Sequence, residues 1–115
     1  MFFAVVCWDR PGVGELREKT RPAHLEYLKR YAGTIHAGGP FENADGGIAG
    51  TLFIIDVPDE ASARAFVDNE PFHKAGVFES SRLRRWRQMQ PEVEPGADDA
   101  VARAGQVRLK QEGNL

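Results

Sequence analysis

The sequence has a single cysteine, no long apolar run and no strong excess of charge of either sign. One cysteine, Cys7, excludes an internal disulfide and fits the reducing cytosol. The apolar run at residues 2–8 is too short to cross a bilayer and lacks the basic start and the cleavage site of a signal peptide. A net charge of −2 provides no general attraction for nucleic acid or anionic lipid. We therefore expect a cytoplasmic protein with no nucleic-acid or membrane partner.

Motifs of nucleotide, dinucleotide and zinc sites are also missing. Glu70 and His73 form one E-x-x-H arrangement, but the sequence has no second carboxylate–histidine set to complete a dinuclear metal site. The arginines at positions 82, 84, 85 and 87 alternate across a predicted strand, and their ordinary role is a solvated edge. We therefore expect neither a metal nor an organic cofactor.

The elements that the sequence does contain fit one α+β domain, because 115 residues leave no room for two cores. Their order is β-α-β-β-α-β, which predicts a ferredoxin-like antiparallel sheet with two helices on one face. Prolines and a glycine after Gln90 mark the end of the core, so we expect a domain over 1–90 and a C-terminal tail over 91–115 without an assignable structure. The predicted strands are 2–8, 34–37, 51–57 and 77–88, and the predicted helices are 13–32 and 59–68.

Local signals refine the connections between these elements. Pro22 should kink helix 13–32 or restart it. Residues 41–50 are rich in Asn, Asp and Gly and predict a hairpin loop. A proline at position 71 can open one further helical turn, which Gly76 closes.

Two strands, residues 2–8 and 51–57, are apolar on both faces, although two helices cover only one face of a four-stranded sheet. The simplest cover for the second face is the same sheet of another copy, packed face to face in a two-fold dimer. Alternation along the last strand places Phe78 and Trp86 on this second face, opposite Leu83. We therefore predict a homodimer.

Two residues on distant segments are the strongest candidates for chemistry. His24 lies at the centre of the apolar face of helix 13–32, and Pro71 fixes the position of Glu70. An imidazole and a carboxylate that meet in a fold can do acid–base chemistry near neutral pH, because the carboxylate fixes one ring nitrogen and the other moves a proton. Each residue also has an ordinary role, as a core histidine bonded to a backbone carbonyl or as a solvated carboxylate at a helix end.

Five segments carry a resemblance to a known family: Arg21–Leu25, Gly39–Pro40, Glu70–Phe72, residues 75–80 and residues 84–88. In their order and spacing, over about residues 2–90, they resemble the YciI-like (YCII-related) family. The resemblance implies a dimeric α+β barrel with a His–Asp site in a cleft near the dimer interface, and one type of member is a dehydrochlorinase of a hydroxylated aromatic. The family's histidine falls on His24, whereas its aspartate is replaced by Glu70, which keeps the charge and adds one methylene.

We accordingly expect a lyase or isomerase that uses a His24–Glu70 dyad on a small anionic or aromatic molecule. The alternative is a non-catalytic binding or regulatory module, in which the same cleft holds a small acidic metabolite. An open pocket beside a His24 that contacts Glu70 favours the enzyme, and a sealed or fully exposed His24 favours the module. The expected substrate-binding residues are Arg84, whose guanidinium suits a carboxylate or phenolate, with Trp86, Gly39, Pro40 and His36.

Overall fold

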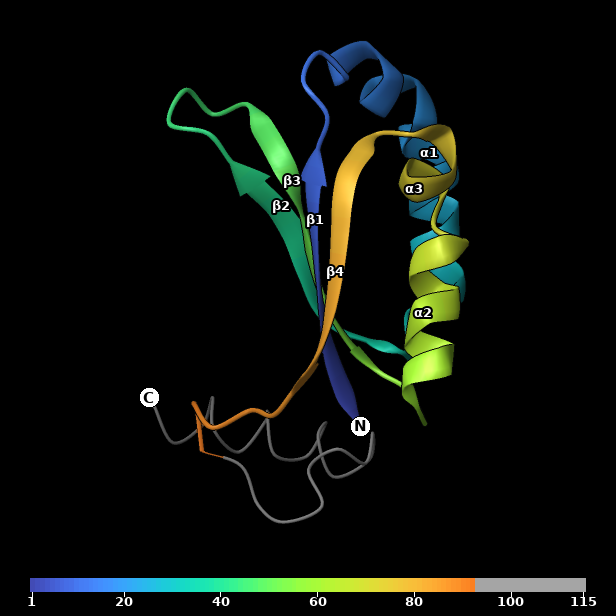
Figure 1. Ribbon diagram of the computed structural model, residues 1–115, viewed down its shortest axis with the longest axis vertical. Coiled ribbons are helices and arrows are strands. Elements are labelled where there is room, and N and C mark those ends of the chain that lie inside the picture. The colour runs from blue at the N-terminus through green and yellow to red at the C-terminus, as the bar shows by residue number, and fades with distance from the viewer. Residues whose placement is uncertain (93–115) are drawn as a thin grey trace.

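The computed structural model describes residues 1–92, so the predicted tail lies almost entirely outside the described residues. Four strands form one antiparallel sheet in the order β2-β3-β1-β4, and all helices lie on one side of it (Figure 1). This arrangement confirms the predicted ferredoxin-like α+β fold. The elements are β1 (Phe2–Asp9), α1 (Gly14–Arg30), β2 (Ile35–Glu42), β3 (Ile48–Asp56), α2 (Glu60–Asp68), α3 (Pro71–Ala75) and β4 (Phe78–Trp86).

Strand β1 lies at the centre of the sheet and sets its register. Val5 pairs with Phe53 of β3 on one side and with Leu83 of β4 on the other, and all three are buried. Gly50 permits the close approach of β3 to β1, since a Cβ at that position would stand 2.1 Å from the carbonyl oxygen of Cys7. The core cluster between sheet and helices comprises Phe3, Val5, Cys7, Tyr27, Phe53, Ile55, Ala63, Phe66, Val67, Phe72, Val77, Phe78 and Leu83.

Two segments differ in part from the prediction. Of the two outcomes predicted for Pro22, a kink or a restart, the restart does not occur, because α1 runs as one helix through Pro22. The carbonyl of Glu18, which loses its helical donor at Pro22, belongs to an exposed residue, where water can bond it. Strand β2 continues through Gly38 and Gly39 to Glu42, which shortens the hairpin loop to its tip, where Asn43 and Gly47 are hydrogen-bonded. Pairing with β3 outweighs the poor strand propensity of the glycines.

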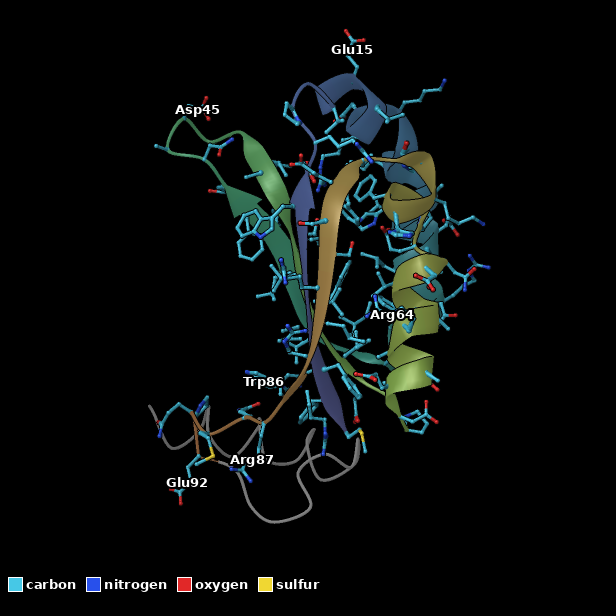
Figure 2. All side chains as sticks on the ribbon, in the orientation of Figure 1. Glu15, Asp45, Arg64, Trp86, Arg87 and Glu92 are labelled. Carbon is cyan, nitrogen blue, oxygen red and sulfur yellow. The ribbon has the colours of Figure 1, made fainter. Side chains whose placement is uncertain are left out.

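The predicted orientation of Phe78 is wrong. Its side chain is 6% exposed, and its ring lies in the core, 6.0 Å between centroids from the ring of Phe72 on α3. The cause is an irregularity in the pairing of β1 with β4 between Trp8 and Asp9, because a β-bulge shifts the alternation of side chains beyond it. Trp86, on the near side of this irregularity, does lie on the face away from the helices (Figure 2).

That second sheet face carries several aromatic side chains. Phe2 contacts the rings of His36 and Trp86, at centroid distances of 4.9 and 5.8 Å. Trp8 stacks on Phe41 at 4.6 Å and remains 43% exposed. The face is therefore apolar and incompletely covered within one chain.

No helix in residues 1–92 is long and apolar enough to span a membrane.

Candidate active site

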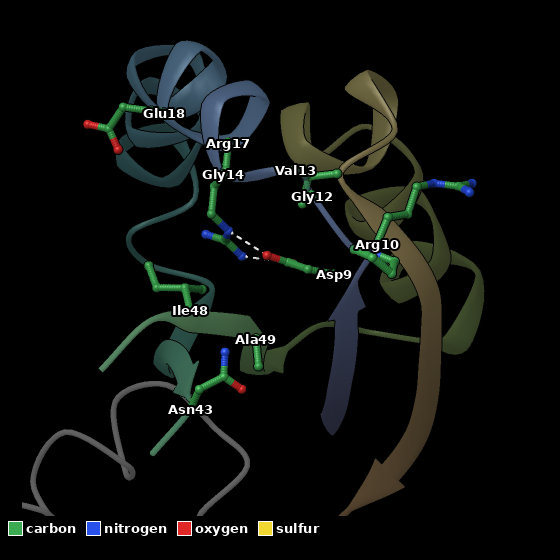
Figure 3. Close-up of a pocket in the computed structure, with 11 residues that line it drawn as sticks. Asp9, Arg10, Gly12, Val13, Gly14, Arg17, Glu18, Asn43, Ile48 and Ala49 are labelled. Carbon is green, nitrogen blue, oxygen red and sulfur yellow. Dashed lines mark hydrogen bonds and ion pairs between the residues drawn. The ribbon is translucent and has the colours of Figure 1, made fainter. Parts of the chain in front are cut away.

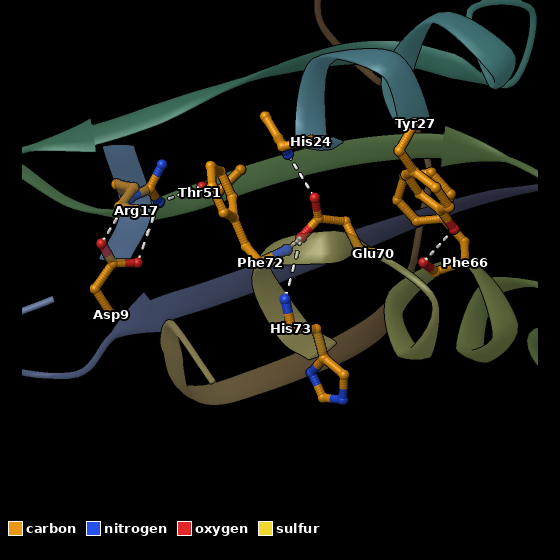
Figure 4. A network of polar contacts seen from close by, with 9 residues as sticks. All are labelled: Asp9, Arg17, His24, Tyr27, Thr51, Phe66, Glu70, Phe72 and His73. Carbon is orange, nitrogen blue, oxygen red and sulfur yellow. Dashed lines mark hydrogen bonds and ion pairs between the residues drawn. The ribbon is translucent and has the colours of Figure 1, made fainter. Parts of the chain in front are cut away.

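The structure brings His24 of α1 against Glu70 at the start of α3. The Nδ1 atom of His24 lies 2.5 Å from Oε1 of Glu70 (Figure 4). The other carboxylate oxygen, Oε2, accepts hydrogen bonds from the backbone N–H groups of Phe72, at 3.0 Å, and His73, at 3.4 Å. Glu70 is therefore the N-cap of α3, and Pro71 occupies the first helical position, where a missing N–H costs nothing.

Burial gives this contact a fixed geometry. Glu70 is 1% exposed, and the imidazole of His24 stacks on the ring of Phe72 at 4.0 Å between centroids with an interplanar angle of 19°. The solvated carboxylate and the backbone-bonded core histidine, the two ordinary roles considered for these residues, are therefore not what the structure shows. A buried carboxylate must be bonded to be tolerated, and Glu70 is bonded through both oxygens.

The second ring nitrogen of His24 has a different environment. Nε2 has no hydrogen-bond partner among residues 1–92. The only buried side-chain N or O atom without a partner in this part of the chain belongs to Ser81, so Nε2 of His24 is accessible to solvent. When Nδ1–H donates to the carboxylate of Glu70, Nε2 carries the free electron pair. The arrangement therefore offers one accessible, oriented nitrogen that can take up and return a proton.

A second polar network, which the sequence analysis missed, lies on the other side of Phe72. The guanidinium of Arg17 donates to both carboxylate oxygens of Asp9, at 2.8 and 3.1 Å, and to Oγ1 of Thr51 at 2.9 Å. Its Cζ atom lies 4.4 Å from the centroid of the Phe72 ring, which His24 also contacts. Arg17 precedes His24 by seven residues, which places both on one helix face, and this spacing was the available signal.

Two further titratable groups near the site stay neutral around pH 7. Burial raises the pKa of the Cys7 thiol to about 11, and the charges of Glu70 and Asp9 add to this effect. Burial also raises the pKa of the Tyr27 hydroxyl above its usual value, and this hydroxyl donates to the carbonyl of Phe66 at 2.7 Å. The protonated, buried Cys7 is a poor nucleophile, so the reactive groups are the imidazole and the ion pair.

The other expected site residues do not gather around His24. Trp86 and His36 lie on the opposite face of the sheet, where Nε2 of His36 is 2.9 Å from Oε1 of Gln88. Arg84 is exposed, pairs with Ala4 and donates to the neighbouring carbonyl of Leu83 rather than facing the core. The cause is the alternation of strand residues, which assigns neighbouring positions to opposite faces of a sheet.

The remaining expected residues lie on β2 and α3. Gly39 is exposed in β2, and its neighbour Pro40 pairs with Thr51 of β3. The ring of His73 points away from Glu70 (Figure 4), and its Nε2 lies 3.9 Å from Oδ1 of Asp68. Within the described chain, no group of three or more His, Cys, Asp or Glu side chains is arranged to hold a metal ion.

Comparisons with known proteins identify a family and several similar solved structures. Residues 1–87 match the sequence model of the YCII-related domain. The 5-chloro-2-hydroxyhydroquinone dehydrochlorinase of Burkholderia phenoliruptrix, solved with 2,5-dihydroxybenzoquinone, is 32% identical, with a TM-score of 0.75 over 80% of this chain and 99% of that one. A protein of Agrobacterium tumefaciens (16% identity, TM-score 0.46) covers 81% of this chain and 100% of its own. One of Arabidopsis thaliana (11%, 0.43) covers 80% and 98%. No curated protein gives a significant match.

Proposed function

We propose that this chain, which belongs to the YCII-related domain family, is an enzyme that performs lyase- or isomerase-type proton transfer on a small molecule without an organic cofactor. One observation carries the proposal. His24 contacts the buried carboxylate of Glu70 through Nδ1 and keeps Nε2 accessible. A carboxylate is costly to bury, so its placement against one nitrogen of an imidazole whose other nitrogen is accessible supports a functional role for the pair.

In the proposed mechanism, Nε2 of His24 takes a proton from a hydroxyl or from a carbon next to a carbonyl of the substrate. The electron pair left behind moves through the substrate. This electron pair then either forms a new double bond and expels a leaving group, which departs with the electrons of its own bond, or it is protonated at another position of the substrate. Glu70 stabilises the imidazolium that forms and keeps the ring in one orientation. General acid–base catalysis of this kind typically contributes about 10²–10⁴-fold.

The structural neighbour supports the substrate class. Its name describes the loss of HCl from a chlorinated, hydroxylated ring, and it was solved with a quinone. Loss of HCl from such a ring requires removal of a proton and departure of chloride, which is the chemistry that an accessible imidazole nitrogen can serve. We propose an oxygenated six-membered ring as the substrate of this chain, with or without a halogen.

The proposal includes a homodimer formed through the second sheet face. Trp8 is 43% exposed there, and Phe41 stacks on it without covering it. A second copy that covers this face would also bring Trp86 and His36 to an interface, where they are available for ligand contacts. A cytoplasmic location belongs to the same proposal, since Cys7 is a free thiol.

Release of chloride from 5-chloro-2-hydroxyhydroquinone tests the function. We expect turnover by the parent protein and a loss of about 100-fold or more for His24→Asn, which hydrogen-bonds but cannot shuttle a proton near neutral pH. Glu70→Gln should lose about 10–100-fold, as is typical for removal of a group that orients a functional histidine. His73→Asn is the matched control, since its ring points away from Glu70 (Figure 4), and it should keep full activity.

Two outcomes would contradict the enzymatic proposal. Equal turnover by His24→Asn and the parent would remove the imidazole from the mechanism. Tight binding of the ring by the parent with no chemical change, tested with chlorinated and unchlorinated hydroxyhydroquinones, would instead support the non-catalytic binding module.

A further inference from the structure

The structure contains a cavity of about 480 Å³ that the dyad does not line. It lies where β1 ends and α1 begins, and the β2–β3 hairpin forms its opposite wall (Figure 3). Its volume falls in the range of about 300–1,000 Å³ that is typical of small-molecule sites. Val13, Ile48 and Ala49 supply apolar walls, and the Asp9–Arg17 ion pair supplies a polar wall.

Arg17 presents unused hydrogen-bond donors in this cavity. Its Nε and Nη2 atoms are bonded to Asp9 and Thr51, whereas Nη1 has no hydrogen-bond partner among residues 1–92. Nη1 is not buried either, because the only buried side-chain N or O atom without a partner in residues 1–92 belongs to Ser81. Figure 3 shows this third nitrogen pointing away from Asp9. A guanidinium fixed by three hydrogen bonds is a preorganised donor that loses little entropy on binding a ligand.

The charge of the cavity limits the ligand. Asp9 is 7% exposed at its side chain, Arg17 is 12% exposed, and the pair neutralises itself. At the rim, the exposed Arg10 and Glu18 again carry opposite charges. A multiply charged anion therefore gains no net attraction, whereas an oxygen atom of a neutral or singly charged ring can accept from Nη1 while the ring packs on Ile48.

We infer that Arg17 is the ligand-binding residue of this cavity and that its Nη1 donates to a ring oxygen of a small, neutral or singly charged oxygenated ring. Arg17 and His24 lie on one face of α1, and both contact the ring of Phe72. The Phe72 ring therefore separates the cavity from the dyad. The inference does not depend on the proposed function, because binding at Arg17 does not require turnover and His24 and Glu70 do not line the cavity.

Binding of hydroquinone and 4-hydroxybenzoate, measured by NMR titration and calorimetry, tests the inference. We expect both to shift the Ile48 methyl and Arg17 Nε–H signals of the parent. Arg17→Lys keeps the positive charge but loses the planar guanidinium with its several N–H donors. This variant should bind both rings about tenfold or more weakly, as expected for one lost charge-assisted hydrogen bond. Arg64→Lys is the matched control, because Arg64 is exposed on α2 outside the cavity, and its affinity should equal that of the parent.

Two more variants keep the test decisive. Ile48 is 45% exposed, so Ile48→Trp should fold and fill the cavity, with weaker binding and an intact ion pair. His24→Asn should bind both rings like the parent, even if it has lost all turnover, which separates this inference from the proposed mechanism. Equal affinities of folded Arg17→Lys and the parent, or no binding of either ring, would overturn the inference. Tighter binding of inorganic phosphate than of the rings would overturn the ligand class.

Discussion

At the scale of single residues, Glu70 has two roles that are usually separate. Its Oε2 caps α3, and its Oε1 contacts the histidine of the candidate site. A substitution that deletes the carboxylate therefore removes a helix cap and a histidine partner together. An isosteric change separates the two roles, because an amide oxygen can still accept from the backbone of α3 but has lost the charge that orients His24.

We predict that Glu70→Gln changes the tautomer of His24 with little change in fold. In the parent, the carboxylate accepts from Nδ1–H, so the neutral ring should carry its proton on Nδ1 alone. In Glu70→Gln this preference should be lost, because an amide can either donate or accept. Ring ¹⁵N chemical shifts of the neutral His24 imidazole measure the tautomer. Identical ¹⁵N shifts in the two proteins would show that Glu70 does not orient the ring.

We also predict that Cys7 makes the protein less stable in alkali. Burial raises the pKa of its thiol from 9.0 to about 11, so the folded state binds this proton more tightly than the unfolded state does. The resulting stabilisation is complete below pH 9 and is lost as the pH rises toward 11, by up to about 2–3 kcal/mol at 1.36 kcal/mol per unit of pKa. Urea denaturation of the parent and of Cys7→Ala at pH 8–11 measures the difference. Parallel pH dependence of the two free energies of unfolding would refute this.

At the scale of elements, α3 determines the geometry of the site. It has five residues, too few to be a stable helix by itself. Three features hold it: the Glu70 cap at its start, Gly76 in the left-handed conformation (φ 85°) at its end, and the buried ring of Phe72 between them. Because Phe72 contacts both His24 and Arg17, a displacement of α3 would disturb the dyad and the ion pair together.

We predict that Gly76→Ala destabilises the fold by about 1 kcal/mol, because a residue with a Cβ pays a conformational cost at positive φ. The space around position 76 is open, so no steric clash contributes. Gly39→Ala is the matched control: its surroundings are equally open, its φ is not positive, and it should change stability little. Urea denaturation gives both values. A loss at position 39 as large as that at position 76 would point to a general cost of adding a methyl group.

At the scale of the whole molecule, the sheet has two unlike faces. The helices lie against one face, while Trp8 and Ile48 remain 43% and 45% exposed elsewhere on the sheet. Exposed apolar surface of this kind usually marks an interaction site. The proposed dimer explains why β1 and β3 carry apolar side chains toward both faces.

We predict that the parent sediments as a dimer at micromolar concentration, with an interface that buries more than ~1,200 Å² in total. Trp8→Glu should dissociate it, since a carboxylate would be buried without a partner. Leu25→Glu is the matched control, because Leu25 is 39% exposed on α1, on the helix side, and should leave the dimer intact. A monomeric parent in analytical ultracentrifugation would refute the proposed interface.

Local patterns in the sequence predicted most of the elements and singled out His24 and Glu70, whereas their pairing was implied by the family resemblance. The apolar runs specify β1 and β3, and helical periodicity turns His24 toward the sheet, because both depend on residues close in sequence. Pro71 after Glu70 likewise indicates a helix start, although the sequence alone left the bonded state of Glu70 open.

Pairings between distant segments required the tertiary structure. Arg17 contacts Asp9 and Thr51, which are 8 and 34 residues away. Helical spacing places Arg17 on the face of His24, but no local pattern identifies Asp9 and Thr51 as its partners. The irregularity beside Trp8 turned Phe78 into the core, and strand alternation separated Trp86 from His24 by the sheet. The sequence thus determined which residues form strands and helices, because that choice depends on local propensity and periodicity. The tertiary structure decided which of them meet, because register and bulges follow from the packing of the whole sheet.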